Sequence, residues 1–260
     1  MQFWQHTLRA PNGSDYLLRL WSPQDPAPAE GYPLLLLLDG DWIHDHVRLF
    51  LARQPRHINY AIATLGFGLE RPAARQRRSY DYTPLPPPPH EAVDPREPNW
   101  PCGGAVDLMA FIQQQVLPTI QQQLSIDPTR LGLYGHSYGG LFVLYSLLTQ
   151  PHLFKHYISA SPSLWWYAPF MQNLAAQLPE LTRRIQLSVL IGGKEQWRPK
   201  PADPQAPRPD GIPTLRFLEP FLTQLPQRSQ LKQQLHIYPE AEHGAMLGLS
   251  TEFALLEFMA

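Results

Sequence analysis

Residues 130–148, "RLGLYGHSYGGLFVLYSLL", decide the fold class of this chain. A short apolar run leads into Gly-His-Ser-Tyr-Gly, and a second apolar run follows at once. This order predicts a strand, a sharp turn and a helix, the arrangement that presents a nucleophilic serine. Small residues must flank such a serine because the strand and helix backbones come close at the turn. The stretch therefore predicts that Ser137 is a nucleophile at the N-terminus of a helix, where the helix dipole favours negative charge.

On both sides of this stretch, further apolar runs alternate with amphipathic ones. The run "YPLLLLLDG" at 32–40 has the unbroken hydrophobicity of a strand buried on both faces of a parallel sheet. Further strands are predicted at 16–22, 59–67, 156–163, 185–193 and 234–240. Helices are predicted at 104–124 with a kink at Pro118, at 141–150 and at 250–259. Together with the serine turn, this pattern predicts an α/β-hydrolase fold over a single domain, 1–260, with a mostly parallel central sheet flanked by helices.

Proline is the unusual feature of the composition, with 30 residues. Many of them fall in two stretches, 83–101 and 198–213. Proline lacks a backbone donor and is excluded from helix interiors and central strands. Both stretches are therefore expected to be surface loops inserted into the domain.

Charge and cysteine content exclude several classes of protein. A formal net charge of −1 argues against a nucleic-acid or membrane-surface partner, since either needs a basic face. The single cysteine, Cys102, excludes an internal disulfide and fits a reducing compartment. Neither a signal peptide nor a membrane span is evident. We expect a cytoplasmic monomer or dimer, or a periplasmic protein if a signal segment has been removed.

A catalytic serine needs a base, and in this fold the chain order is nucleophile, acid, histidine. Only His236 and His243 lie beyond the strand predicted at 185–193. His236 falls inside the last predicted strand, where a structural role is expected. His243 follows that strand and precedes the final helix, at the sheet edge where Ser137 lies. The order therefore predicts His243 as the base.

The acid is less closely defined by the sequence. It should lie in the loop that follows the strand at 185–193, and Glu195 fits this place best. Asp203 is the next candidate but falls in a proline-rich stretch. A Ser–His dyad oriented by backbone groups is the alternative to both.

Two backbone N–H groups should form an oxyanion hole. We predict Tyr138 as one donor, and Gly40 or Asp41 in "LLLLLDGDW" as the other. A rival interpretation of the following residues is a metal site; it would use Asp41, His44, Asp45 and His46. Such spacings in a turn are weak evidence, and no third cluster completes a coordination shell. We therefore expect neither a metal nor another cofactor.

Four motifs together resemble the ferric-enterobactin esterase group of the esterase D-like family. They are "RRSYDYTP" at 77–84, "GHSYGGLFVLYSLL" at 135–148, "SASPSLWW" at 159–166 and "EHGAM" at 242–246. The resemblance runs from about residue 33 to the C-terminus. It implies hydrolysis of a catecholate siderophore ester, with the family's arginine, serine and histidine at Arg78, Ser137 and His243.

The substrate that this resemblance implies is a bulky, aromatic small molecule, and its ferric complex is a trianion. Arg78 is expected to supply positive charge, and Trp165, Trp166 and Trp42 to supply flat apolar faces. The alternative for the tryptophans is core and rim packing. A general carboxylesterase or thioesterase is the competing enzyme, acting on feruloyl, acyl or formyl-thiol esters. A catalytically silent hydrolase fold used for binding is the third possibility.

Overall fold

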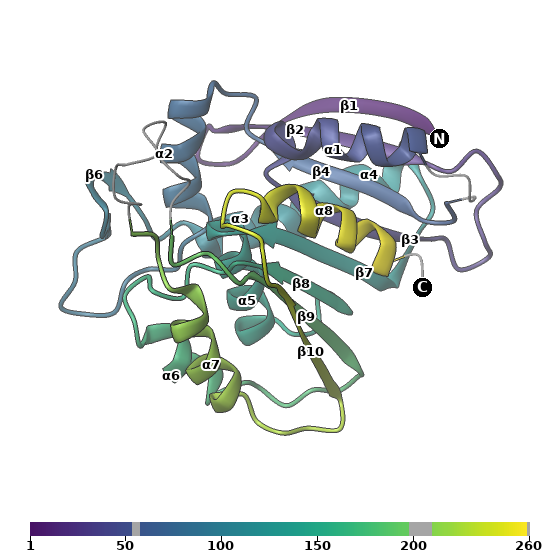
Figure 1. The fold of residues 1–260 in the computed structure, drawn as a ribbon. Helices are drawn as coiled ribbons and strands as arrows, with labels where there is room; N and C mark the ends of the chain where they lie inside the picture. Colours follow the sequence, from purple (N-terminus) through teal and green to yellow (C-terminus); the bar gives the residue numbers. More distant parts are fainter. Residues whose placement is uncertain (54–57, 198–209, 259–260) are drawn as a thin grey trace.

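The computed structural model describes residues 1–53, 58–197 and 210–258 (Figure 1). Its strands are β1 (Gln2–Arg9), β2 (Asp15–Ser22), β3 (Tyr32–Leu38), β4 (Ala61–Gly66), β5 (Val93–Asp94), β6 (Glu97–Pro101), β7 (Ile126–His136), β8 (His156–Ala160), β9 (Ile185–Gly192) and β10 (Leu231–Tyr238). Its helices are α1 (Gly40–Arg53), α2 (Arg71–Asp81), α3 (Ala105–Phe111), the π-helix η1 (Ile112–Val116), α4 (Leu117–Gln123), α5 (Tyr138–Thr149), α6 (Phe170–Ala175), α7 (Thr214–Gln224) and α8 (Met246–Glu257).

The main sheet has eight strands in the order β1-β2-β4-β3-β7-β8-β9-β10. Strand β2 pairs antiparallel with β1 and β4, and the pairs from β4 through β10 are parallel. All seven residues of β3 are buried, as expected for a strand covered on both faces. The predicted α/β-hydrolase fold with a mostly parallel sheet is confirmed.

Helices cover both faces of this sheet and create two cores. Helices α1 and α8 pack side by side on one face, as Figure 1 shows, over side chains such as Leu35 and Tyr134. Helices α3, α4 and α5 cover the other face, over side chains such as Leu36 and Leu133. Because the parallel strands β3, β7, β8, β9 and β10 end at one edge, the loops after them share that edge.

The predicted kink in the helix at 104–124 takes a different form from the expected one. The helix is broken by the π-helical turn η1, where the Leu117 N–H donates to the Ile112 carbonyl. Pro118 then lies in the first turn of α4, where its missing N–H is not needed. The change in the helical hydrogen-bonding pattern therefore comes before Pro118 in the chain.

The proline-rich stretch 83–101 is not only a loop. Its second half forms the hairpin β5–β6, in which Val93 is paired with Pro101. A separate two-stranded ribbon tolerates proline because few ladder hydrogen bonds are required of each strand. Most of the second stretch, 198–209, lies outside the described residues.

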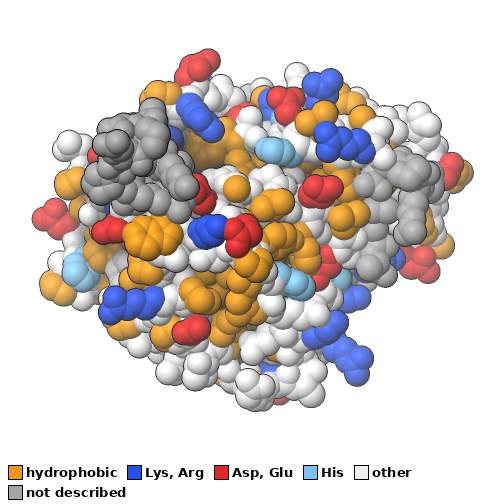
Figure 2. Space-filling model, in the orientation of Figure 1, with side chains coloured by type: hydrophobic (Ala, Val, Ile, Leu, Met, Phe, Trp, Pro, Cys, Tyr) orange, Lys and Arg blue, Asp and Glu red, His pale blue; other side chains and the backbone are white. Residues whose placement is uncertain are grey.

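On the face drawn in Figure 2, basic and acidic side chains lie interspersed rather than in separate fields. Within the described residues, no helix has the length and apolar character needed to cross a membrane.

Candidate active site

Ser137 occupies a strained turn between β7 and α5. Its φ of 60° and ψ of −114° lie where side chains are rarely found. The turn brings Gly135 so close to Gly139 that a Cβ at Gly135 would lie 2.3 Å from the Gly139 carbonyl oxygen. The Ser137 N–H donates to the Ala160 carbonyl at 2.9 Å, which ties the turn to the end of β8. The predicted strand–turn–helix geometry is present.

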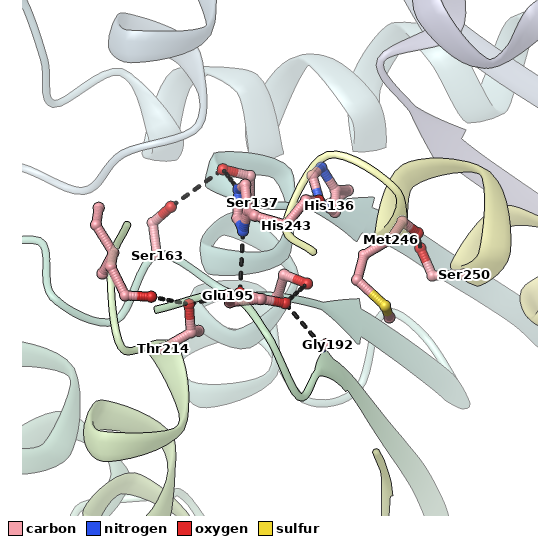
Figure 3. A network of polar contacts seen from close by, with 11 residues as sticks. His136, Ser137, Ser163, Gly192, Glu195, Thr214, His243, Met246 and Ser250 are labelled. Atoms are coloured by element: carbon pink, nitrogen blue, oxygen red, sulfur yellow. Dashed lines mark hydrogen bonds and ion pairs between the residues drawn. The ribbon is translucent and has the colours of Figure 1, made fainter. Parts of the chain in front are cut away.

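Two further strands bring a histidine and a carboxylate to this turn (Figure 3). His243, in the loop after β10, places Nε2 3.1 Å from Ser137 Oγ. Its Nδ1 lies 3.0 Å from Glu195 Oε2, and Glu195 follows β9. The predicted juxtaposition of the three side chains is therefore present. His236 instead lies within β10 and packs on Phe253, and Asp203 lies outside the described residues.

Glu195 is 2% exposed and has a full set of donors. Ser161 Oγ and the Gly192 N–H donate to Oε1 at 2.5 and 2.8 Å, and Thr214 Oγ1 donates to Oε2 at 2.6 Å. Burial alone would raise the pKa of Glu195, but its bonds to His243 and the two hydroxyls hold it below the usual value. The carboxylate is thus ionised and fixed in orientation against His243.

His136, next to the nucleophile, supports His243 from the other side. The two rings lie 4.8 Å apart, and His136 Nε2 donates to the His243 carbonyl at 3.0 Å. Burial, together with the His243 and Arg78 charges, lowers the pKa of His136 well below its usual range. The ring is therefore neutral, with its proton on Nε2.

The predicted oxyanion-hole donors lie at the N-termini of two helices. Tyr138 is the first residue of α5, and Gly40 and Asp41 open α1. N–H groups in a first helical turn have no intrahelical acceptor and are available to an anion.

The Asp41 side chain accepts from the Phe67 and Gly68 N–H groups and pairs with Arg19. No group of three metal-ligating side chains occurs in the described part of the chain.

Two cavities meet at Ser137. The larger holds about 670 Å³, and its lining includes four arginines, two tryptophans and one carboxylate: Arg71, Arg75, Arg78, Arg96, Trp42, Trp100 and Glu97. The smaller holds about 260 Å³ and is lined mainly by Ser163, Trp165, Trp197 and Ile212. Ser163 Oγ lies 3.3 Å from Ser137 Oγ. Trp42 and Trp165, each half-buried, thus lie where a substrate could contact them.

The structure corrects one of the expected substrate contacts and changes the surroundings of another. Trp166 is fully buried and cannot reach a substrate, because its side chain fills the core. Arg78 lines the larger cavity as expected, but its side chain is only 10% exposed and forms an ion pair with Asp39. Its contact with a substrate therefore stays a prediction.

Sequence reasoning missed the arginines that are exposed in the larger cavity. Arg71 and Arg75 are one turn apart on α2, a helical spacing that could have indicated a common face. Neither has a carboxylate partner among the described residues. Arg96 comes from the β5–β6 hairpin and lies 4.6 Å from the centres of both the Tyr138 and Trp165 rings. Nothing local in the sequence indicates that this hairpin returns to the site.

Comparison with known proteins agrees with this geometry. A model of the Esterase family, described as "Putative esterase", matches residues 12–237. The chain is 31% identical over 243 residues to the apo-salmochelin esterase of Escherichia coli O6:H1, a match covering 92% of this chain and 74% of that protein.

Two further matches are similar in kind. The chain is 34% identical over 199 residues to the ferri-bacillibactin esterase BesA of Bacillus subtilis, covering 70% of this chain and 66% of BesA. The solved structure of the enterobactin and salmochelin hydrolase IroE is 28% identical, with a TM-score of 0.74 over 100% of this chain and 95% of that one.

Proposed function

This chain belongs to the Esterase family and is a serine hydrolase, and we propose that it hydrolyses ester bonds of a catecholate siderophore. The substrate would be an enterobactin-like trilactone or its ferric complex. The observation that carries the proposal is the cavity of about 670 Å³ that Ser137 lines together with arginines and tryptophans, of which Arg71 and Arg75 form no ion pair among the described residues. The similar proteins named above, described as siderophore esterases and hydrolases, support it.

The cavity matches the chemistry of a ferric tris-catecholate. Arg71 and Arg75 offer positive charge and form no ion pair among the described residues, although Glu97 also lines the cavity. Guanidinium groups bind oxygen anions through directed hydrogen bonds. Trp42 and Trp100 offer flat faces for catechol rings. Arg96 adds charge at the point where the larger and smaller cavities meet, although Asp94 lies 3.6 Å from its Nε.

Acylation begins when Ser137 Oγ attacks the ester carbonyl and His243 Nε2 accepts the serine proton. Glu195 keeps the His243 Nδ1 proton in place and stabilises the imidazolium. The N–H groups of Tyr138 and of Gly40 or Asp41 receive the developing oxyanion. The C–O bond then breaks, and His243 returns the proton to the departing serine hydroxyl of the siderophore.

Deacylation repeats these steps with water. His243 accepts a proton from the water as the water oxygen attacks the acyl-enzyme carbonyl. The bond to Ser137 Oγ breaks, the proton returns to that oxygen, and the free acid leaves. Each cycle consumes one ester bond and one water molecule, and no other reactant is needed.

The proposal is tested by comparing kcat/KM on a ferric catecholate trilactone with kcat/KM on a neutral p-nitrophenyl ester. Arg75→Gln should lower kcat/KM on the trilactone by about 10- to 100-fold, since one charge-assisted hydrogen bond contributes roughly 1.5–3 kcal/mol. Hydrolysis of the neutral ester should change little. Added salt should shrink the difference, because the side chain is exposed.

Arg48→Gln is the matched control, because it removes an exposed arginine of α1 that does not line the cavity. It should leave both substrates unaffected. Rapid hydrolysis of p-nitrophenyl, feruloyl or thiol esters without measurable turnover of any catecholate would instead identify a general esterase of the same family.

A further inference from the structure

The oxyanion hole has two arms: residues 39–41 after β3, and residues 136–138 between β7 and α5. Arg78 and Asp39 form a buried ion pair that contacts both arms. Arg78 Nε lies 2.7 Å from Asp39 Oδ1, and Nη2 lies 3.0 Å from Oδ2. Arg78 is 8% exposed and Asp39 is 4% exposed. The Trp42 ring lies 4.5 Å from the guanidinium carbon and the Tyr82 ring 5.5 Å. The pair is thus bidentate and enclosed by aromatic rings.

Each partner is attached to one arm of the hole, Asp39 through the chain itself and Arg78 through a hydrogen bond. Asp39 immediately precedes Gly40 and Asp41 and has a φ of 60°, a conformation that costs energy in a non-glycine residue. On the other arm, Arg78 Nη2 also donates to the carbonyl of His136 at 3.1 Å, and His136 precedes Ser137.

The two arms also approach one another directly. A Cβ at Gly139, the second residue of α5, would lie 3.3 Å from Asp39 Oδ2. A single guanidinium therefore connects the loop after β3 to the loop after β7, at the point where both must aim their N–H groups at one oxygen atom.

We propose that Arg78 and Asp39 are positioning residues that hold the two arms of the oxyanion hole in register. This rests on the proposed hydrolytic function but not on the identity of the siderophore. Oxyanion stabilisation depends on donors that are already aimed before charge develops, and removing a single donor typically costs 10²–10³ in kcat. A pair that fixes both donors therefore acts on the transition state and not on the ground state.

The test must separate positioning from stability, because a single substitution leaves an unpaired buried charge and can unfold the protein. The double variant Asp39→Asn/Arg78→Gln removes both charges and retains hydrogen-bonding groups. Asparagine is also the side chain, besides glycine, that best tolerates a positive φ at position 39. Folding is checked by urea unfolding before kinetics are measured.

The kinetics use a neutral p-nitrophenyl ester and a trifluoromethyl ketone, which adds Ser137 Oγ to give a tetrahedral oxyanion. We expect kcat to fall about 10- to 100-fold with KM nearly unchanged, and the ketone Ki to rise by the same factor as kcat/KM falls. Arg78→Lys keeps the positive charge but lacks the planar guanidinium that reaches both Asp39 and the His136 carbonyl, so this variant should retain only part of the wild-type kcat.

The matched control is the neighbouring, partly buried pair on α2, in which Arg77 Nε lies 2.7 Å from Asp81 Oδ2. Arg77→Gln/Asp81→Asn should lower stability while leaving the ketone Ki at the wild-type value. A folded Asp39→Asn/Arg78→Gln variant with wild-type kcat and ketone Ki would overturn the proposal. So would wild-type kcat on the neutral ester together with a loss of kcat/KM on the ferric catecholate trilactone, measured in parallel, which would return Arg78 to substrate binding. A wild-type protein inactive on every ester would instead refute the proposed function.

Discussion

The backbone of Ser137 holds strain that the function requires. A non-glycine residue at a φ of 60° and ψ of −114° costs about 1–3 kcal/mol, whereas glycine adopts such angles freely. A glycine at this position would relieve the strain, but it would also make the unfolded chain more flexible, which offsets part of the stability gained. We expect Ser137→Gly to be about 1 kcal/mol more stable than Ser137→Ala in urea unfolding, with both variants inactive. Equal stability of the two would show that the strain at the turn is no larger than this offset, about 0.4–1 kcal/mol.

Glu195 decides whether the site works as a triad. The His243 Nδ1 distance of 3.0 Å and the three other donors around the carboxylate indicate that it orients the imidazole. Glu195→Gln places an amide N–H₂ among donors and disturbs that orientation. We expect kcat on a neutral ester to fall by about 10³–10⁴, the effect of the same change in a serine-protease triad. A loss under about tenfold would favour the dyad.

Single residues differ in how far the sequence alone predicts them. The positions of Ser137 and His243 follow from a local turn and from chain order, which are properties of adjacent residues. The partner of Arg78 does not, because Asp39 is 39 positions away and an arginine before "DYTP" has the same local pattern whether it faces a substrate or a carboxylate. The expected substrate contact of Trp166 was wrong for a similar reason: the sequence does not show which of two adjacent tryptophans faces the core and which faces the cavity.

At the scale of elements, the packing of β7 against α5 sets the position of the nucleophile. A Cβ at Gly135 would lie 2.3 Å from the Gly139 carbonyl oxygen, a contact that only backbone movement can relieve. We expect Gly135→Ala to lower the free energy of unfolding by about 3 kcal/mol, the upper part of the usual range for overpacking, and to reduce kcat. Urea unfolding and hydrolysis of a neutral ester would measure both effects.

Gly244→Ala provides the comparison within the same site. Apart from its two chain neighbours, no described residue has an atom within 4 Å of a Cβ at Gly244, although Gly244 follows His243 directly. Its stability should change by about 0.5 kcal/mol or less, as for ordinary surface substitutions. A Gly135→Ala variant as stable as Gly244→Ala would contradict the close approach of strand and helix.

Elements with strong hydrophobic patterns were predicted, and those with special backbone hydrogen bonding were not. The run at 32–40 and the helix after Ser137 are almost wholly apolar, which leaves few alternatives to burial. The π-helical turn η1 was not predicted because its side-chain spacing differs from an α-helix by one residue. The β5–β6 hairpin was missed because its proline content argues against strands in general.

At the scale of the whole molecule, burial of neutral histidines makes stability depend on pH. The unfolded chain takes up protons near the ordinary histidine pKa of 6.5, while the folded chain resists until the lowered pKa is reached. Burial, with Lys155 and Arg130, lowers the pKa of His156 to about 4, and burial lowers that of His136 well below its usual range. The unfolded state therefore binds more protons in this range, and stability falls as pH decreases.

The size of this effect can be measured with His156→Gln, which removes one titrating group beside Phe258. Wild type should lose up to about 1.4 kcal/mol per pH unit more than the variant between pH 6.5 and about 4. Burial raises the pKa of Asp81 to about 6, which acts in the opposite sense but cancels in this comparison. His6→Gln, at an exposed position of β1, is the surface control. If urea unfolding from pH 8 to pH 4.5 gave parallel curves for wild type and His156→Gln, His156 would have to be as free to take up a proton in the folded chain as in the unfolded one.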